Sequence, residues 1–314
     1  MRRVVVIVGP TAVGKSQLAF HLAQRLDGEI VSADSRQIYR YMDIGTSKPS
    51  PGERALVPHH LVDIIDPDQD FTLALYQEMA YQAIADIQRR GKLPLLVGGS
   101  GLYVWSVVEG WQIPRVPPQL ELRRELEARV DSEGVKALYR ELEEADPKAA
   151  RRIDPHNVRR VIRALEVWRL AGVPFSQLGR KEAPSLATLV IGLTTERADL
   201  YHRIDTRVDG MIEQGLVAEV RDLMERGYGL DLPSMSGLGY RQIGGFLRGE
   251  MELSAAVQQV KFTTHRLARH QYAWFKAGDE RISWFDVREK VEGPVTRLAD
   301  NFRAAKPGVK SHIA

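Results

Sequence analysis

The amino-acid sequence predicts an α/β protein with a parallel-sheet core, an all-helical insertion and a helical C-terminal part. Two observations carry this prediction. Up to about residue 113, short β-branched runs alternate with amphipathic helical stripes, and strands that alternate with helices pair in parallel through right-handed crossovers. After Trp111, Pro114, Pro117 and Pro118 interrupt the chain, and residues 119–181 then show only helical periodicity.

The core begins with a continuous β-branched run at Val4–Val8, which is typical of a strand buried on both faces. The next segment, Lys15–Leu26, has apolar residues at helical spacing and is predicted to be an amphipathic helix. Further strands are expected at Ile30–Ala33, Leu93–Val97, Thr188–Leu193 and Arg281–Asp286, and a long helix is expected at Leu73–Arg90.

The domain boundaries follow from this pattern. Residues 1–114 and 186–303 are expected to form a discontinuous α/β core, and residues 304–314 a disordered tail. Residues 115–185 are expected to form the helical insertion domain, with helices at Leu120–Val130, Gly134–Glu144, Asp146–Ile153 and Asn157–Ala171.

The composition excludes several classes of protein. The sequence has no cysteine, which excludes disulfides and thiolate metal sites and agrees with a reducing cytoplasm. No apolar run reaches the roughly 18–20 residues of a membrane span, and strand-like residues from Val4 leave no room for a signal peptide. A net charge of +3 is compatible with a nucleic-acid partner and equally with an enzyme of another kind.

A phosphate-binding loop follows the first predicted strand. Its sequence matches G-x-x-x-x-G-K-[ST] between a buried strand and a helix, as that motif requires. Its backbone N–H groups are expected to surround phosphate oxygens, with a lysine charge and a serine hydroxyl that reaches Mg²⁺. The loop consists of Gly9, Pro10, Thr11, Ala12, Val13, Gly14, Lys15 and Ser16.

The loop alone does not identify the phosphorylated ligand. A kinase that binds ATP would be expected to carry a second apolar strand that ends in a metal-binding aspartate. The strand at Leu93–Val97 ends instead in Gly-Gly-Ser-Gly, without a carboxylate. Whether ATP binds this loop stays open at this point.

A cluster of polar residues follows the second predicted strand, at the ligand-binding edge of a parallel sheet. From the sequence, Asp34 could act as a general base, Arg36 could hold phosphate and Gln37 could contact a nucleic-acid base. Asp34 could equally be an N-cap that starts a short helix at Ser35.

Residues 151–169 of the insertion are rich in arginine. They contain six arginines against Asp154 and Glu166, and Arg159 and Arg163 lie four residues apart on one helix face. This pattern fits a stripe that follows a phosphate backbone, and it also fits a well-solvated helix.

The motifs form an ordered series that resembles a known family. The phosphate loop is followed by Asp34–Tyr39, Gly45–Pro49, Pro58–Asp63, Val97–Tyr103, Asn157–Glu166, Gly239–Gln242 and Gln271–Phe275. In order and spacing, over about residues 3–285, this series resembles the bacterial tRNA dimethylallyltransferases, also called tRNA isopentenyltransferases.

The resemblance implies a fold, a reaction and partners. Members have a nucleoside-triphosphatase-like core with a helical insertion. They transfer a dimethylallyl group from dimethylallyl diphosphate to N6 of the adenine just 3′ of the anticodon in tRNA, and they need Mg²⁺. The resemblance therefore implies a cytoplasmic transferase, expected to be a monomer, that binds tRNA and dimethylallyl diphosphate.

The resemblance also implies roles for individual residues. Asp34 corresponds to the general base, and Thr11 and Ser16 would line the site of the leaving group, with Ser16 reaching Mg²⁺. Arg203 corresponds to an arginine near the diphosphate, although it could also form a surface ion pair with Asp199.

The resemblance also implies tRNA contacts, in the expected core and in the expected insertion. Ser100 could instead cap the helix that follows it, and Arg123 could belong to a solvated face. The implied contacts are Asp34, Ser35, Arg36, Gln37, Ser100, Arg123, Arg159, Arg160, Val161, Ile162 and Arg163.

The C-terminal motif departs from the family at one position. His270 stands where an arginine is common, so an RNA contact there would be weaker or pH-dependent. The following Trp274 and Phe275 are expected in the core rather than stacked on a base. Two other functions remain open from the residues alone: a small-molecule kinase that uses ATP, and an RNA-binding protein without chemistry of its own.

Overall fold

The computed structural model describes residues 2–114, 116, 119–178 and 186–305. The chain divides into two compact units. The core unit comprises Met1–Phe71, Tyr76–Val108 and Ser185–Ala314, and the helical unit comprises Thr72–Leu75 and Glu109–Pro184. Among the described residues, no helix is long and apolar enough to cross a membrane.

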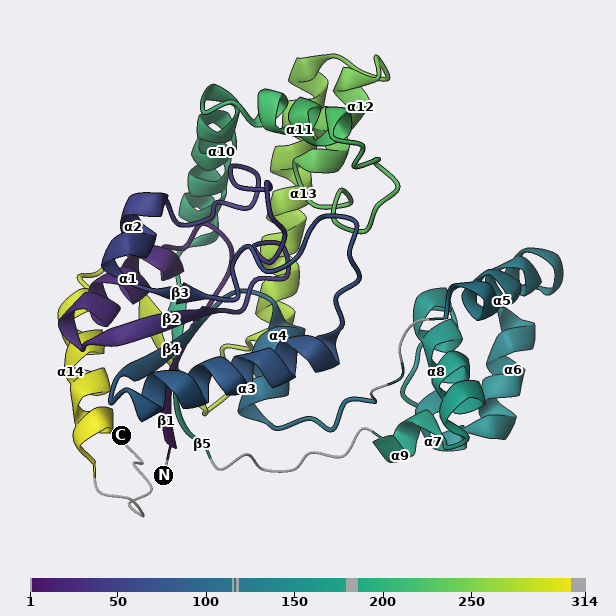
Figure 1. The fold of residues 1–314 in the computed structure, drawn as a ribbon, viewed down its shortest axis with the longest axis horizontal. Coiled ribbons are helices and arrows are strands. Elements are labelled where there is room, and N and C mark those ends of the chain that lie inside the picture. Colours follow the sequence, from purple (N-terminus) through teal and green to yellow (C-terminus); the bar gives the residue numbers. More distant parts are fainter. Residues whose placement is uncertain (1, 115, 117–118, 179–185, 306–314) are drawn as a thin grey trace. The chain divides into compact units, whose positions relative to one another are not determined.

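A six-stranded parallel sheet forms the centre of the core unit (Figure 1). The strand order is β3-β2-β4-β1-β5-β6, so the N-terminal strand lies between strands from distant parts of the sequence. The prediction of a parallel α/β core is confirmed. The strands are β1 (Arg2–Val8), β2 (Gly28–Ser32), β3 (His59–His60), β4 (Leu93–Val97), β5 (Leu186–Thr194) and β6 (Ile282–Asp286).

Helices cover both faces of this sheet. Val5 and Ile7 pack into a buried cluster with residues of α1 (Lys15–Arg25), α10 (Arg197–Glu213), α13 (Leu253–Trp274) and α14 (Glu292–Ala304). The alternate residues Val4, Val6 and Val8 are buried too, on the face where α3 (Leu73–Arg89) and α4 (Gly101–Val108) lie. Both faces are therefore covered, as a parallel sheet requires.

A second cluster of the core unit is helical. It joins α11 (Leu216–Glu225), α12 (Tyr240–Leu247) and the start of α13 to the segment around Ile38 and Met42. The remaining short helix, α2 (Pro51–Leu56), begins with a capping box in which Ser50 and Glu53 bond each other's backbone N–H groups. Helix α14 includes Ala304, and the rest of the predicted tail, 306–314, lies outside the described residues.

The helical unit has its own core. Leu126, Leu138, Leu142, Val161 and Leu165 are fully buried within it. Its helices are α5 (Leu120–Glu133), α6 (Val135–Ala145), α7 (Pro147–Ala150), α8 (Val158–Ala171) and α9 (Phe175–Leu178). Helix α7 begins at Pro147, is capped by Asp146 and ends at Ala150, so it is shorter than the helix that was expected at Asp146–Ile153.

Candidate functional site

The phosphate loop connects β1 to α1 at the carboxyl edge of the sheet. Gly9 and Gly14 have φ values of 143° and 106°, and a Cβ atom on Gly9 would lie 2.5 Å from the carbonyl oxygen of Leu193. Glycine at position 9 therefore lets the loop pack directly on the end of β5. The helix that follows presents its N-terminus to the loop, and such an end favours anions.

The ammonium group of Lys15 lies inside this loop. It donates a hydrogen bond to the carbonyl oxygen of Pro10, at 2.7 Å. Burial, and after it the charge of Arg207, lower the pKa of Lys15 to about 7, while the charge of Asp34 opposes both effects. An anion bound in the loop would stabilise the charged lysine.

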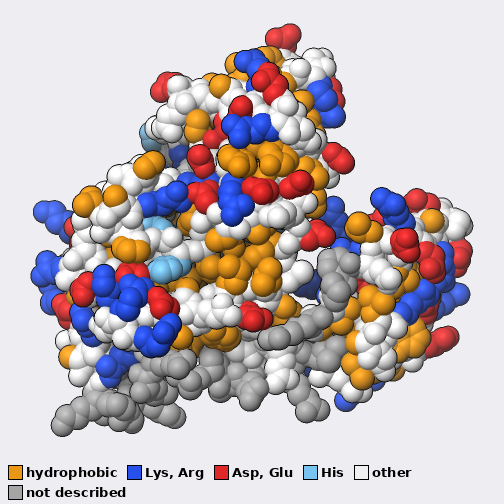
Figure 2. All heavy atoms as spheres, viewed as in Figure 1, with side chains coloured by type: hydrophobic (Ala, Val, Ile, Leu, Met, Phe, Trp, Pro, Cys, Tyr) orange, Lys and Arg blue, Asp and Glu red, His pale blue; other side chains and the backbone are white. Residues whose placement is uncertain are grey.

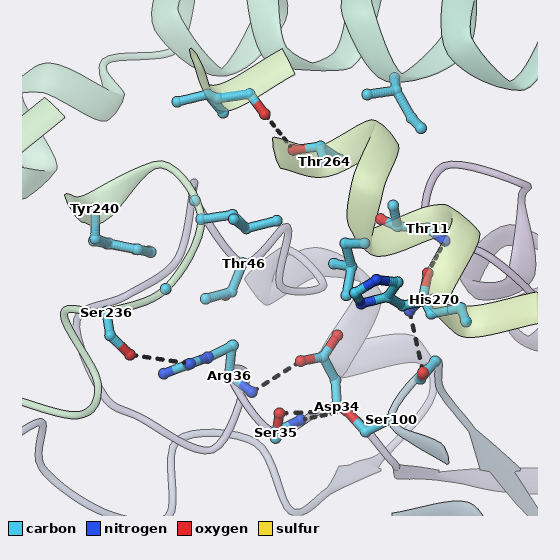
Figure 3. A pocket seen from close by; sticks show the side chains of 18 of the residues that line it. Thr11, Asp34, Ser35, Arg36, Thr46, Ser100, Ser236, Tyr240, Thr264 and His270 are labelled. Atoms are coloured by element: carbon cyan, nitrogen blue, oxygen red, sulfur yellow. Dashed lines mark hydrogen bonds between the residues drawn. The ribbon is translucent and has the colours of Figure 1, made fainter. Parts of the chain in front are cut away.

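A cavity of about 520 Å³ opens beside the loop (Figure 3). We call it the substrate pocket. Thr11 of the loop, Asp34 after β2 and Arg207 of α10 contribute its polar wall. One part of its lining is apolar and comes from α10, α13 and the loop before α12: Ile204, Val208, Met211, Leu238, Val260, Leu267 and Trp274.

Asp34 faces this pocket from the turn that follows β2 (Figure 3). One carboxylate oxygen accepts a hydrogen bond from the backbone N–H of Arg36 at 2.8 Å, and residues 35–38 form turns rather than a helix. The N-cap interpretation is therefore wrong. The turn orients the carboxylate, and its charge acts on both Lys15 and Arg207.

The side chains of Arg36 and Gln37 are occupied by the protein itself. Arg36 donates to the backbone of Pro233 and Ser234 and to Ser236 Oγ. Gln37 donates to the carbonyl oxygens of residues 46 and 47, and accepts a hydrogen bond from Ser32. These bonds hold both side chains in place. Arg36 lines the pocket and Gln37 does not, and a contact of either residue with tRNA stays a prediction.

Ser100 joins two loops at the edge of the sheet. Its hydroxyl accepts a hydrogen bond from the backbone N–H of Ser35 at 3.1 Å and lies 3.3 Å from the hydroxyl of Ser35. Ser100 directly precedes α4 and its carbonyl oxygen accepts the hydrogen bond of the Val104 N–H at 3.0 Å, so it also occupies the N-cap position, although its hydroxyl bonds Ser35 rather than the helix. Both serines line the substrate pocket.

The wall formed by residues 42–48 has no regular secondary structure. The carboxylate of Glu219 accepts hydrogen bonds from the backbone N–H groups of Asp43, Ile44 and Gly45 and from the hydroxyl of Tyr240. The buried ammonium of Lys48 bonds the carbonyl of Tyr39 and the carboxylates of Asp43 and Asp63. The bonds of Lys48 explain the lysine, and the glycine is needed because a Cβ on Gly45 would lie 2.6 Å from the ring of Tyr240.

The arginine beside the phosphate loop is Arg207, not Arg203. Arg207 donates to Thr11 Oγ1 at 3.1 Å and to Ser47 Oγ at 2.9 Å, and burial lowers its pKa while Asp34 opposes the shift. Arg203 is exposed and does not line the pocket. The two residues are one helical turn apart, and the sequence alone could not decide which turn faces the loop.

Gln271 of α13 connects the phosphate loop to the β4–α4 turn. It accepts a hydrogen bond from the backbone N–H of Thr11 at 2.7 Å and donates one to the carbonyl of Gly99 at 3.1 Å. No role for Gln271 was predicted from the sequence. The sequence could have indicated a role through a glutamine at a buried position of an amphipathic helix, because a buried amide needs hydrogen-bond partners.

His270, Trp274 and Phe275 lie at the C-terminal end of α13. Phe275 is fully buried, as expected, whereas Trp274 lines the pocket and is 37% exposed. The core prediction is therefore wrong for Trp274. His270 is exposed at the pocket and, within the described residues, has no hydrogen-bond partner.

The donor set of the loop fits Mg²⁺ that arrives with a phosphorylated ligand. The Ser16 hydroxyl is exposed and makes no hydrogen bond to any described residue. Across the same residues, no group of three His, Cys, Asp or Glu side chains could hold a metal ion alone. Mg²⁺ commonly binds through substrate phosphates, waters and one or two protein oxygens, so a single hydroxyl suffices.

In the helical unit, a buried carboxylate holds two of the predicted tRNA-contacting arginines. Glu166 accepts hydrogen bonds from Arg123 and Arg163 and from the backbone N–H of Gln119. Burial raises the pKa of Glu166, but these bonds outweigh it and leave the pKa below its usual range. Both arginines therefore stabilise the unit.

The other residues of that group divide between the surface and the core. Arg159 and Arg160 are exposed, whereas Val161 and Ile162 are buried in the core of the unit and cannot reach a ligand with their side chains. On the face that Figure 2 shows, basic and acidic side chains are interspersed over α5, α6 and α8. Within the same unit, Arg129 and Arg169 both pair with Glu141.

Fold and site together define a P-loop transferase, with a phosphate loop, a carboxylate and an apolar wall around one pocket. The chain belongs to the IPP transferase family, whose model matches residues 37–278, and the related isopentenyl transferase model matches residues 2–57. It is thus a transferase of prenyl groups.

Similar proteins and similar solved structures agree with this family assignment. The chain is 57% identical to the tRNA dimethylallyltransferase of Roseiflexus castenholzii, covering 86% of this chain and 88% of that protein. It is 50% identical to that of Thermomicrobium roseum, covering 95% and 93%. The crystal structure of the tRNA isopentenylpyrophosphate transferase of Bacillus halodurans matches with a TM-score of 0.70 and 42% identity, over 96% of this chain and 97% of that one. A eukaryotic dimethylallyltransferase acting on tRNA matches with a TM-score of 0.83 and 26% identity, over 99% and 82%.

Proposed function

We propose that this protein transfers a dimethylallyl group from dimethylallyl diphosphate to N6 of the adenine 3′-adjacent to the anticodon in tRNA. One observation carries the proposal: a carboxylate, a phosphate loop with a lysine and an arginine beside it, and an apolar wall share one pocket. An anionic leaving group, a base and a hydrocarbon group are the three things that this reaction brings together.

The leaving group would bind in the phosphate loop. Lys15 and Arg207 lie within the range of each other's charge, and Arg207 also bonds Thr11 of the loop. Two desolvated cations beside backbone N–H groups can stabilise the negative charge that grows on the diphosphate as its C–O bond breaks. Mg²⁺ bound to the diphosphate and to Ser16 would add Lewis-acid stabilisation of the same charge.

The proton would move to Asp34. The N6 nitrogen of adenine attacks C1 of the dimethylallyl group, the bond from C1 to the diphosphate oxygen breaks, and N6 gives up one proton. The lone pair of an exocyclic amine is delocalised into the ring, so a carboxylate that takes this proton as the bond forms assists the attack. The apolar wall would hold the hydrocarbon chain and keep water away.

The tRNA would be held at more than one place. The adenine must leave its stack to enter the pocket, because a stacked base cannot present N6 to a buried carbon atom. Arg159 and Arg160 are exposed cations of the helical unit that could bind the phosphate backbone. We further propose that the protein acts in the cytoplasm as a monomer.

A single assay tests the proposal. The protein is incubated with Mg²⁺, radiolabelled dimethylallyl diphosphate and unmodified tRNA, and the label in tRNA is measured. Label on N6 of the adenine next to the anticodon is expected, and a tRNA with guanine at that position is the matched control. ATP hydrolysis without transfer of label would indicate a kinase, and tRNA binding without either reaction would indicate a binding protein.

A further inference from the structure

A second cavity of the core unit, of about 230 Å³, lies at the end of β5 against a different face of α13 from the substrate pocket. We call it the β5 cavity. Its polar lining consists of Thr194, Thr195, Arg197, Tyr201, Arg269 and Tyr272, and no acidic residue lines it. The proposed reaction gives this cavity no role.

Two arginines meet at one oxygen atom in the β5 cavity. Arg197 Nε and Arg269 Nη1 each donate a hydrogen bond of 3.0 Å to the hydroxyl of Tyr201. Burial raises the pKa of Tyr201, but these bonds, that of Arg269 first, outweigh it and lower the pKa. Two guanidinium groups that share one acceptor repel each other, so the arrangement favours an anion between them.

The charge of this pair is not balanced by a carboxylate. Over the described part of the chain, neither Arg197 nor Arg269 forms an ion pair with Asp or Glu. The carboxylate of Glu196, next in sequence, is bonded by Arg288 at 2.9 Å. Each arginine uses one N–H group on Tyr201, and its other N–H groups remain available for a ligand.

A buried hydroxyl supplies independent evidence for a ligand. Thr195 lines the cavity, is only 8% exposed, and its Oγ1 has no hydrogen-bond partner among the described residues. The neighbouring hydroxyl of Thr194 lies 3.0 Å from that of Tyr272 and is satisfied. A buried polar atom without a partner is costly and uncommon, so a ligand oxygen that reached this hydroxyl from the cavity would relieve that cost.

We propose that the β5 cavity binds a phosphate group. Guanidinium forks match phosphate oxygens bidentately, and a threonine hydroxyl can donate to a third oxygen. The cavity is smaller than the roughly 300–1,000 Å³ of typical small-molecule sites, which fits a single anionic group rather than a whole nucleotide. The phosphate can be a phosphodiester of bound RNA or free inorganic phosphate, and the proposal does not depend on the reaction in the substrate pocket.

The test separates this cavity from the phosphate loop. Binding of radiolabelled inorganic phosphate is measured by equilibrium dialysis with the full chain carrying Lys15→Ala, which weakens the loop. Adding Arg269→Gln is expected to lower phosphate affinity at least about tenfold, since a charge-assisted hydrogen bond is worth roughly 1.5–3 kcal/mol. Arg266→Gln, an exposed arginine of the same helix, is the matched control and should change nothing.

A second variant distinguishes a ligand-binding hydroxyl from a structural one. Thr195→Val removes the unpaired Oγ1 and keeps the shape of the side chain. If the hydroxyl serves a ligand, the variant binds phosphate more weakly yet has a higher Tm without phosphate. A structural hydroxyl would lower the Tm and leave phosphate affinity unchanged. That result, or equal phosphate affinity with and without Arg269→Gln, overturns the proposal.

The salt dependence of tRNA binding distinguishes a phosphodiester of RNA from free inorganic phosphate as the ligand of the β5 cavity. With Lys15 intact, Arg197→Gln with Arg269→Gln reduces the slope of log affinity for tRNA against log salt by roughly 0.7–0.9 if the cavity holds one RNA phosphate. An unchanged slope, together with abolished binding of inorganic phosphate, assigns the cavity to free phosphate.

Discussion

Asp34 is held by the turn that it starts, and its carboxylate lines the substrate pocket. Asp34→Asn keeps the bond to the backbone N–H of Arg36 and removes the base. We expect kcat to fall by roughly 10²–10⁴-fold, the usual contribution of a general base, while the Kd for tRNA changes by less than about twofold. Single-turnover kinetics and filter binding measure the two quantities.

The matched control for this change is Asp68→Asn, because Asp68 is an exposed aspartate of the same unit that makes no side-chain hydrogen bond among the described residues. It should leave both quantities unchanged. Parallel losses of turnover and of tRNA affinity in Asp34→Asn would make Asp34 a binding residue only.

Lys15 makes diphosphate binding depend on pH. Its pKa in the free protein is about 7, lowered by burial and by Arg207, and a bound anion raises that pKa. Binding therefore takes up a proton above about pH 7, and affinity falls by up to about tenfold per pH unit there; below pH 7 Lys15 is already charged and contributes no slope. Calorimetry in two buffers of different ionisation enthalpy measures the number of protons that are taken up when diphosphate binds.

Lys15→Arg is the comparison, since arginine stays charged throughout and the pH dependence that remains is that of diphosphate itself. Identical slopes in the two proteins would show that Lys15 does not titrate in this range.

At the scale of the helix, the register of α10 decides which arginine serves the site. Arg207→Gln removes the bonds to Thr11 and Ser47, and we expect kcat/KM for dimethylallyl diphosphate to fall about 10- to 100-fold. Arg203→Gln, one turn earlier and exposed, should be nearly neutral. Steady-state kinetics decide the matter, and a larger loss in the Arg203 variant would reverse the assignment.

The strands of the sheet were predictable to the extent that their residues are apolar. The expected strand at Ile30–Ala33 is observed at Gly28–Ser32 because Glu29 is buried, and the pattern offers no sign of that. Hydrogen bonds from Arg90 above all, and also from His60 and Lys92, outweigh burial and lower the pKa of Glu29 to about 2. The two-residue β3 has no periodicity at all.

The parts of the site that directly follow a strand in the sequence could be predicted. The phosphate loop and Asp34 each follow a strand, so their meeting at the sheet edge could be expected. The contributions of Arg207, Gln271 and Trp274 depend on how α10 and α13 pack, which a single helical pattern does not determine.

At the scale of the whole chain, the helical unit carries the surface that we propose for RNA binding. Arg159 and Arg160 are exposed, whereas Arg163 is held by Glu166. Charge reversal to Glu at both positions should weaken tRNA binding and reduce its salt slope by roughly 0.7–0.9 for each phosphate that the protein no longer neutralises. Arg140→Glu on α6, also exposed and without a side-chain partner among the described residues, is the control. An unchanged slope in the double variant would mean that the RNA binds elsewhere on the protein.

The order of the strands has a consequence for how the chain folds. β1 pairs with β5 in the register Arg2 with Leu186 to Val8 with Gly192, so this central pairing must close a loop that contains the entire helical unit. Contacts within the helical unit are local and can form early, whereas closing so long a loop is slow. During refolding, pulsed hydrogen exchange should therefore protect amides of α8 before those of β1. Until β5 has left the ribosome, a growing chain has the complete phosphate-loop sequence but lacks Leu193, the residue at the end of β5 on which Gly9 packs.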